Sequence, residues 1–191
     1  MQAELDAHFW DNGADGAAAA DGYFFTADDA EQLISRPKES YDGAIPSGNS
    51  AAALNLVRLG RMTGDTAYEE RASDLMTAFG GNIARSPMGH AMMLTAVDFG
   101  IGPSHEIVVV GDAEAEDTAA MLAALRGVYL PNKVVMLRPL NDEAAAPLTA
   151  LSPFTEYQTA LDEAATVYVC QNFFCERPTT ETAVMLEMLG K

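Results

Sequence analysis

The sequence predicts a mixed α+β protein, with helical hairpins first and a small α/β subdomain with a short, mainly parallel sheet after them. Up to about Phe99, apolar residues recur at helical spacing. From Glu106 onward, short apolar runs typical of strands alternate with helical stretches. The Gly- and Pro-containing stretch Gly100–Ser104 separates the two patterns. We therefore place a helical-hairpin region at residues 1–102 and an α/β subdomain at residues 103–191.

The elements of the first half are predicted from apolar spacing, capping residues and breakers. Pro37 ends one short helix, because the residue before a proline is disfavoured in the α region. Ser47 and Asn49 can cap the next helix, and Asp65 caps its partner across a tight αα-hairpin. The expected order is a short helix at Glu4–Trp10, a loop at Asn12–Asp21, an extended aromatic segment at Gly22–Thr26, a helix from Asp28 or Asp29 to Ser35, a loop at Lys38–Pro46, and helices at Ser47–Gly64, Asp65–Ile83 and Met88–Phe99.

The elements of the second half are predicted from short apolar runs between turn signals. The first strand is wholly apolar, as in parallel sheets that are buried on both faces, and it begins a βαβ unit. Thr179 or Thr180 can cap the last helix. The expected order is a strand at Ile107–Val110, a helix at Glu114–Gly127, a strand at Lys133–Leu137, an irregular stretch at Pro139–Thr159 with one helical turn near Pro153, a strand at Thr166–Cys170 and a helix at Thr179–Leu189. The methionines, including Met88, Met92, Met93, Met185 and Met188, are expected to fill the core.

The charge of the chain excludes several partner classes. Asp and Glu number 28 against 11 Lys and Arg, which gives a net charge of −17. This charge repels nucleic acid and anionic membranes, so neither is an expected partner. No apolar stretch reaches the length of a membrane span, and the acidic N-terminus lacks a signal core, so we expect a cytoplasmic protein. The Lys-poor acidic surface fits either adaptation to high salt or an ordinary solvated surface.

The loop from Arg36 to Ser50 is the main candidate site, because charged and aromatic side chains meet there between two helices. Sugars are recognised by aromatic faces together with carboxylates and amides that pair with hydroxyl groups. The alternative is a structural loop in which Asp42 makes a turn and Ser47 and Asn49 cap a helix. The candidate catalytic residues are Asp42, Glu39 and His90, and the candidate substrate-binding residues are Tyr23, Phe25, Arg36, Lys38, Tyr41, Ser47 and Asn49.

Other motifs predict little cofactor chemistry. The strand-to-helix turn Val108–Asp117 carries one glycine and four carboxylates, which repel phosphate, so no nucleotide cofactor is expected. Two cysteines and three scattered histidines form no closed zinc set, so no metal is expected. Cys170 and Cys175 are a candidate redox pair, although their four-residue gap differs from a thioredoxin-type motif. Two reduced thiols are the expected state in the cytoplasm, and a reversible disulfide is the alternative.

Several of these segments carry a resemblance to a known family. The chain resembles the C-terminal part of thioredoxin-domain-containing proteins related to spermatogenesis-associated protein 20. The stretches that carry it are Asp21–Thr26, Arg36–Lys38, Tyr41–Ser50, Tyr168–Cys170, Cys175 and Pro178. The resemblance implies part of an α/α toroid of helical hairpins, similar to six-hairpin glycosidases, and hence a carbohydrate-active relative.

The resemblance also implies that the chain is a fragment. A six-hairpin toroid needs about twelve helices, more than this half holds, and the family's thioredoxin-like domain with its Cys-x-x-Cys is absent. A partial toroid leaves an apolar face open, so we expect either self-association or docking to a missing N-terminal region.

Three functions remain open from the sequence. The first is binding of a sugar or polyol beside the aromatic turn, with or without catalysis. The second is a non-catalytic interaction or scaffold module. The third is a thiol redox module that uses Cys170 and Cys175.

Overall fold

The computed structural model describes residues 2–13, 21–31 and 34–191, and confirms the mixed helix-and-strand class. The chain divides into two compact units. The first comprises residues 1–57 and 66–100, and the second comprises residues 58–65 and 101–191. Among the described helices, none combines the length and the apolar character that a membrane crossing requires.

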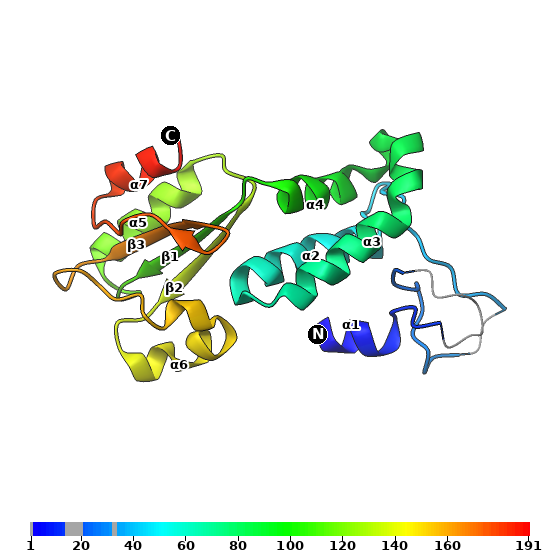
Figure 1. Ribbon diagram of the computed structural model, residues 1–191, viewed down its shortest axis with the longest axis horizontal. Helices are drawn as coiled ribbons and strands as arrows, with labels where there is room; N and C mark the ends of the chain where they lie inside the picture. The colour runs from blue at the N-terminus through cyan, green and yellow to red at the C-terminus, as the bar shows by residue number, and fades with distance from the viewer. Residues whose placement is uncertain (1, 14–20, 32–33) are drawn as a thin grey trace. The chain divides into compact units, whose positions relative to one another are not determined.

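The first unit is built from helices and the loops between them (Figure 1). Its core contains the fully buried side chains of Leu56, Leu75, Met93 and Phe99. Its elements are α1 (Gln2–His8), the first part of α2 (Gly48–Thr63), α3 (Thr66–Arg85), the 3₁₀ turn η1 (Pro87–His90) and α4 (Ala91–Ile101).

Helix α2 begins and ends as its sequence predicts. The Ser47 hydroxyl accepts a hydrogen bond of 3.1 Å from the Ser50 amide, which satisfies an N-terminal donor of the helix. Gly64 follows the helix with φ of 76°, a conformation that costs glycine little. The expectation that Met88 fills the core is wrong, because Met88 is 96% exposed at the start of η1.

The predicted helix before Pro37 is absent from the described part of that segment. Residues 28–31, 34 and 35 are turn, bend or coil, and residues 32 and 33 lie outside the described residues. The Asp28 amide instead donates to the carbonyl of His8, at 2.9 Å. Most of the loop expected at Asn12–Asp21 also lies outside the described residues.

The second unit contains a four-stranded mixed sheet in the order β2-β1-β3-β4. Strand β1 pairs parallel with β2 and antiparallel with β3, and β3 pairs antiparallel with β4. The sheet is therefore mixed rather than mainly parallel, because two of its three strand pairs are antiparallel. The strands are β1 (His105–Val110), β2 (Lys133–Arg138), β3 (Thr166–Gln171) and β4 (Phe174–Cys175).

Helices α5 (Glu116–Gly127) and α7 (Thr182–Met188) contact each other, and they pack against strands β1 and β3 of the sheet. The core between α5, α7 and the sheet includes Ile107, Met121, Val167 and Met185. The predicted apolar strand is fully buried, as expected.

Helix α6 (Asp142–Leu151) occupies part of the stretch that we expected to be irregular. Asn141 caps it by accepting hydrogen bonds from the amides of Glu143 and Ala144. Pro147 lies inside the helix, and the sequence therefore did not predict a helix here, because proline usually breaks helices. The turn η2 (Pro153–Thr155) confirms the single helical turn predicted near Pro153.

Candidate functional site

The Asn49 side chain holds the aromatic turn in place. Its Oδ1 accepts a hydrogen bond of 2.7 Å from the Tyr23 amide, and its Nδ2 donates to the carbonyls of Tyr23 and Glu39 at 2.9 and 2.8 Å. Asn49 is therefore a buried connector between the turn and α2, rather than the cap of α2 that its position predicts. Ser47 supplies the cap alone.

The Tyr23 side chain is also bound inside the first unit. Its hydroxyl donates to the Asp6 carboxylate at 2.6 Å, and its ring meets Trp10 edge to face at a centroid distance of 4.9 Å. Burial, together with the hydrogen bond to Asp6, raises the pKa of Tyr23 above its ordinary value. Tyr23 is thus a buried neutral phenol that supports the turn.

Asp42 ties two segments of the first unit together. Its Oδ1 accepts from the Ser47 amide at 2.9 Å, and its Oδ2 accepts from the amides of Met92 and Met93 at 2.8 and 3.2 Å. Burial opposes ionisation, but these hydrogen bonds and one from Ser50 outweigh it and lower the pKa of Asp42. The result is a carboxylate engaged with the backbone at the start of α4.

His90 lies in η1 and is buried against the same loop. Its Nδ1 is 2.8 Å from the Ser86 carbonyl, which can only accept, so Nδ1 carries a proton. Its Nε2 is 3.3 Å from the Ser40 hydroxyl. The Tyr41 ring meets the imidazole edge to face, with centroids 6.2 Å apart.

Gly89 makes room for the Tyr41 ring. A Cβ atom at residue 89 would lie 2.5 Å from Tyr41 Cε2, so a larger residue would displace the ring. The other side of Tyr41 faces outward, and the residue is 66% exposed. The Tyr41 ring, which we expected to provide an aromatic face, is therefore open to solvent.

An open polar groove of about 580 Å³ brings several of these residues together. Four of the predicted site residues line it, namely Lys38, Glu39, Tyr41 and His90. Sequence reasoning missed its other lining residues, Ser40, Asn82, Arg85 and Ser86. The last three lie at and just after the end of α3, and no sequence pattern links that end to residues 38–41.

A smaller cavity of about 210 Å³ lies beside the aromatic turn. Tyr23, Phe25, Glu39 and Asn49 line it, and its remaining walls are mostly apolar. Glu39 lines both this cavity and the groove. Among the residues that the structure describes, neither hollow is lined by Asp42, Arg36 or Ser47.

The two basic residues of the loop pack on the Phe24 ring. The Arg36 guanidinium lies 4.2 Å from the ring centroid and the Lys38 ammonium 4.8 Å from it. Arg36 also donates to the carbonyls of Thr26 and His8, and Lys38 forms an ion pair with Asp11. Both cations therefore support the loop, and Lys38 also reaches the wall of the groove.

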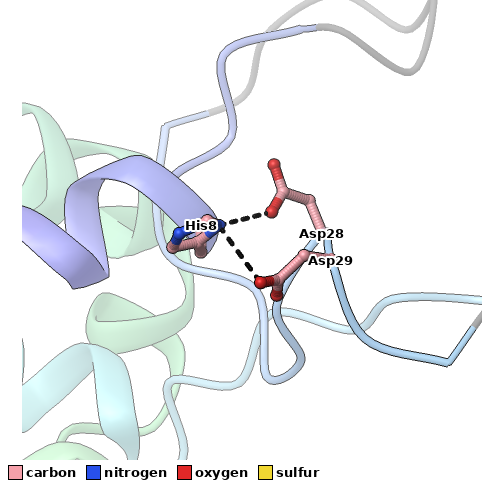
Figure 2. Close-up of side chains that lie close together, drawn as sticks. All are labelled: His8, Asp28 and Asp29. Atoms are coloured by element: carbon pink, nitrogen blue, oxygen red, sulfur yellow. Dashed lines mark hydrogen bonds and ion pairs between the residues drawn. The ribbon is translucent and has the colours of Figure 1, made fainter.

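His8, Asp28 and Asp29 gather at the end of α1, as Figure 2 shows. His8 Nδ1 lies 2.9 Å from Asp28 Oδ1 and 3.9 Å from Asp29 Oδ2. The hydrogen bond to Asp28, with the charge of Asp29 next, raises the pKa of His8. An ion pair of this kind accounts for the arrangement, although three such groups are also typical metal ligands.

Cys170 and Cys175 are joined by a disulfide, so the expectation of two free thiols is wrong. A two-residue turn at Asn172 and Phe173 places the cysteines directly opposite each other across β3 and β4. The four residues between the cysteines could have indicated this disulfide. A two-residue hairpin turn pairs its flanking residues across the two strands, so residues separated by four others can face each other.

No family model matches the chain. It is 33% identical over 190 residues to spermatogenesis-associated protein 20 of Homo sapiens and 32% identical to that of Rattus norvegicus, in matches that cover 99% of this chain. It is 27% identical over 191 residues to the uncharacterized protein B0495.5 of Caenorhabditis elegans. The chain spans only 23% of the human relative's length, so it is similar to one stretch of the longer spermatogenesis-associated protein 20.

Proposed function

We propose that the open groove of the first unit binds a small carbohydrate or polyol. The observation that carries the proposal is that an exposed tyrosine face, a carboxylate and a guanidinium line one hollow, from Tyr41, Glu39 and Arg85. Sugars pack their C–H faces on aromatic rings and share paired hydrogen bonds with carboxylates and guanidinium groups. The volume of about 580 Å³ lies within the usual range for small-molecule sites.

We propose binding without glycoside hydrolysis. Hydrolysis uses two carboxyl groups about 5 to 9.5 Å apart that face the scissile bond. Glu39 is the one carboxylate among the described residues of the groove wall. The oxygens of Asp42 are engaged with backbone amides instead.

A panel of monosaccharides and disaccharides tests the proposal by thermal unfolding. A ligand at a hundredfold excess over Kd stabilises the folded state by about 2.7 kcal/mol, a visible shift in melting temperature. Tyr41→Ala is expected to abolish that shift, and Gly89→Ala to weaken it by displacing the ring. The matched control is Tyr129→Ala, which removes an exposed tyrosine from the second unit and leaves the shift unchanged.

A shift that persists in Tyr41→Ala would place the ligand elsewhere, and no shift with any sugar would reject the proposal. Asp42→Ala is a poor probe, because it removes three backbone hydrogen bonds and disturbs the fold.

A second candidate is an interaction module of a longer protein. Ile34, Ile45 and Met88 in the first unit are almost fully exposed, and the chain matches 23% of its human relative's length. Exposed apolar side chains form contact surfaces where they are contiguous, whereas single ones are also common on monomers. Sedimentation over a range of concentrations tests self-association, and Met88→Lys is expected to weaken it. A monomer at every concentration would contradict self-association through these residues.

A further inference from the structure

The disulfide of the second unit has one buried end and one exposed end. Cys170 on β3 is 1% exposed, whereas Cys175 on β4 is exposed. An incoming sulfur can therefore reach Cys175, while Cys170 is shielded by the sheet. Such asymmetry assigns distinct roles to the two sulfurs of an exchanging pair.

A buried amide is directed at the exposed cysteine. Gln158 Nε2 lies 3.8 Å from Cys175 Sγ and donates to it, and Gln158 is itself 5% exposed. Its Oε1 has no hydrogen-bond partner among the described residues. An N–H group held against a sulfur stabilises negative charge on that sulfur, which is the reactive form of a cysteine.

The turn between the two cysteines is anchored independently of the disulfide. The Phe173 amide donates to Glu106 Oε2 at 3.1 Å, and Arg61 donates to Asn172 Oδ1 at 2.7 Å. Glu106 is fully buried on β1 and also lies 3.4 Å from Arg61. These contacts hold the hairpin when the sulfur–sulfur bond is open, so the two thiols stay opposed.

We propose that Cys170 and Cys175 form a thiol–disulfide exchange site whose partner is a dithiol. This activity is separate from the ligand groove of the first unit. Cys175 is the sulfur that exchanges with the partner, and Gln158 supplies the N–H group that stabilises its thiolate. Glu106 is a positioning residue, because it acts through the backbone of the turn.

The exchange balances in two steps. A thiolate of the partner attacks Cys175 Sγ, the Cys170–Cys175 bond breaks, and Cys170 leaves with the electron pair and takes up a proton. The partner's second thiol then loses its proton and, as a thiolate, attacks the partner sulfur of the mixed disulfide, and Cys175 leaves with the electron pair and takes up a proton. The partner dithiol loses two electrons and two protons and becomes a disulfide, and the cysteine pair gains both.

Equilibration of the whole chain with dithiothreitol in reduced and oxidised form tests the proposal. After acid quench and alkylation, mass spectrometry is expected to show reversible conversion between disulfide and dithiol. Circular dichroism is expected to show that the reduced chain stays folded. A disulfide that reacts only after the chain unfolds would overturn the proposal and leave a structural cross-link.

Single-cysteine variants test the assigned roles. With oxidised glutathione, Cys170→Ser is expected to trap a mixed disulfide at Cys175, and Cys175→Ser to trap far less at Cys170. In the Cys170→Ser background, Gln158→Ala is expected to slow trapping roughly three- to tenfold, because the Cys175 thiolate loses one hydrogen bond. The matched control is Gln171→Ala, which alters the neighbouring β3 glutamine. Equal trapping at both cysteines, or no effect of Gln158→Ala, would contradict the roles.

Glu106 variants separate positioning from general stability. Glu106→Gln keeps an acceptor for the Phe173 amide and is expected to retain reoxidation, whereas Glu106→Ala is expected to slow it. The rate of reoxidation is compared with the free energy of unfolding of each reduced variant. Equal reoxidation rates in both variants would reject the positioning role.

Discussion

At the scale of single residues, several polar side chains of the Arg36–Ser50 loop bind main-chain atoms, many of them in other segments of the first unit. Asn49 makes three hydrogen bonds to main-chain atoms, and Asp42 accepts three. A buried amide or carboxylate that is fully paired stabilises a fold, and leaving its partners unpaired is costly. Tyr41, Glu39 and His90 are left to shape the groove.

Asn49→Ala is expected to lower the free energy of unfolding by roughly 2–4 kcal/mol, because it leaves the buried amide and carbonyl of Tyr23 without partners. Urea unfolding measures the change. The matched control is Asn82→Ala, which removes an exposed amide from α3 and should change stability by less than about 0.5 kcal/mol. An equal effect of the two substitutions would contradict the role of Asn49 as a buried connector between the aromatic turn and α2.

Asp28→Asn is expected to lower the pKa of His8 toward its ordinary value of 6.5, since the bond to Asp28 is the main cause of the raised pKa. The pair stabilises the fold fully below pH 6.5 and above pH 3.8. That contribution is lost as pH rises through the raised pKa of His8 or falls through the lowered pKa of Asp28. NMR titration of the His8 ring measures the shift, and an unchanged His8 pKa would contradict the pairing.

At the scale of elements, the helices α2 to α4 follow from the sequence because they carry their own periodicity, and Ser47 also caps α2. Helix α6 does not, since Pro147 contradicts it locally while the cap from Asn141 supports it. The antiparallel direction of β3 could not be predicted, because the apolar pattern of a strand does not show which strand it pairs with or in which direction. The groove could not be predicted either. It forms where residues 38–41 meet the end of α3, and no local sequence pattern shows that these segments lie together.

Gly111→Ala is expected to lower the free energy of unfolding by about 1–3 kcal/mol, because its Cβ would overlap the hydroxyl of the buried Thr118 at the junction of β1 and α5. Adding Thr118→Ala should recover part of the loss, with a coupling of at least about 0.5 kcal/mol in urea unfolding. The matched control is Gly127→Ala, whose Cβ position has no atom within 4 Å. Additive losses would show that the two residues do not collide.

At the scale of the whole molecule, the single tryptophan and the disulfide lie in different units. Trp10 belongs to the first unit and Cys170–Cys175 to the second. Fluorescence therefore reports on the first unit, while circular dichroism reports on the helices of both.

Reduction of the disulfide is expected to destabilise the second unit by roughly 2 kcal/mol, through the added freedom of the unfolded chain. Urea unfolding with and without dithiothreitol should shift the circular dichroism midpoint more than the Trp10 fluorescence midpoint. Cys170→Ala with Cys175→Ala provides a control that dithiothreitol leaves unchanged. Equal shifts of both signals in the wild-type chain would mean that the two units unfold together.

The net charge of −17 predicts that added salt stabilises the whole chain, since screening weakens self-repulsion in the compact state. The melting temperature is expected to rise with KCl concentration. A melting temperature that does not change with KCl would favour an ordinary solvated surface over salt adaptation.

The brevity of β4 bears on how the protein behaves at high concentration. An unpaired strand edge is a template on which a second molecule can add a strand, the first event in fibre growth. Strand β4 offers two residues before the chain reaches Glu176, Arg177 and Pro178, which bring two charges and one backbone nitrogen without a hydrogen. This edge offers a neighbouring molecule too few consecutive backbone N–H donors to pair with, so this end of the sheet resists edge-to-edge growth.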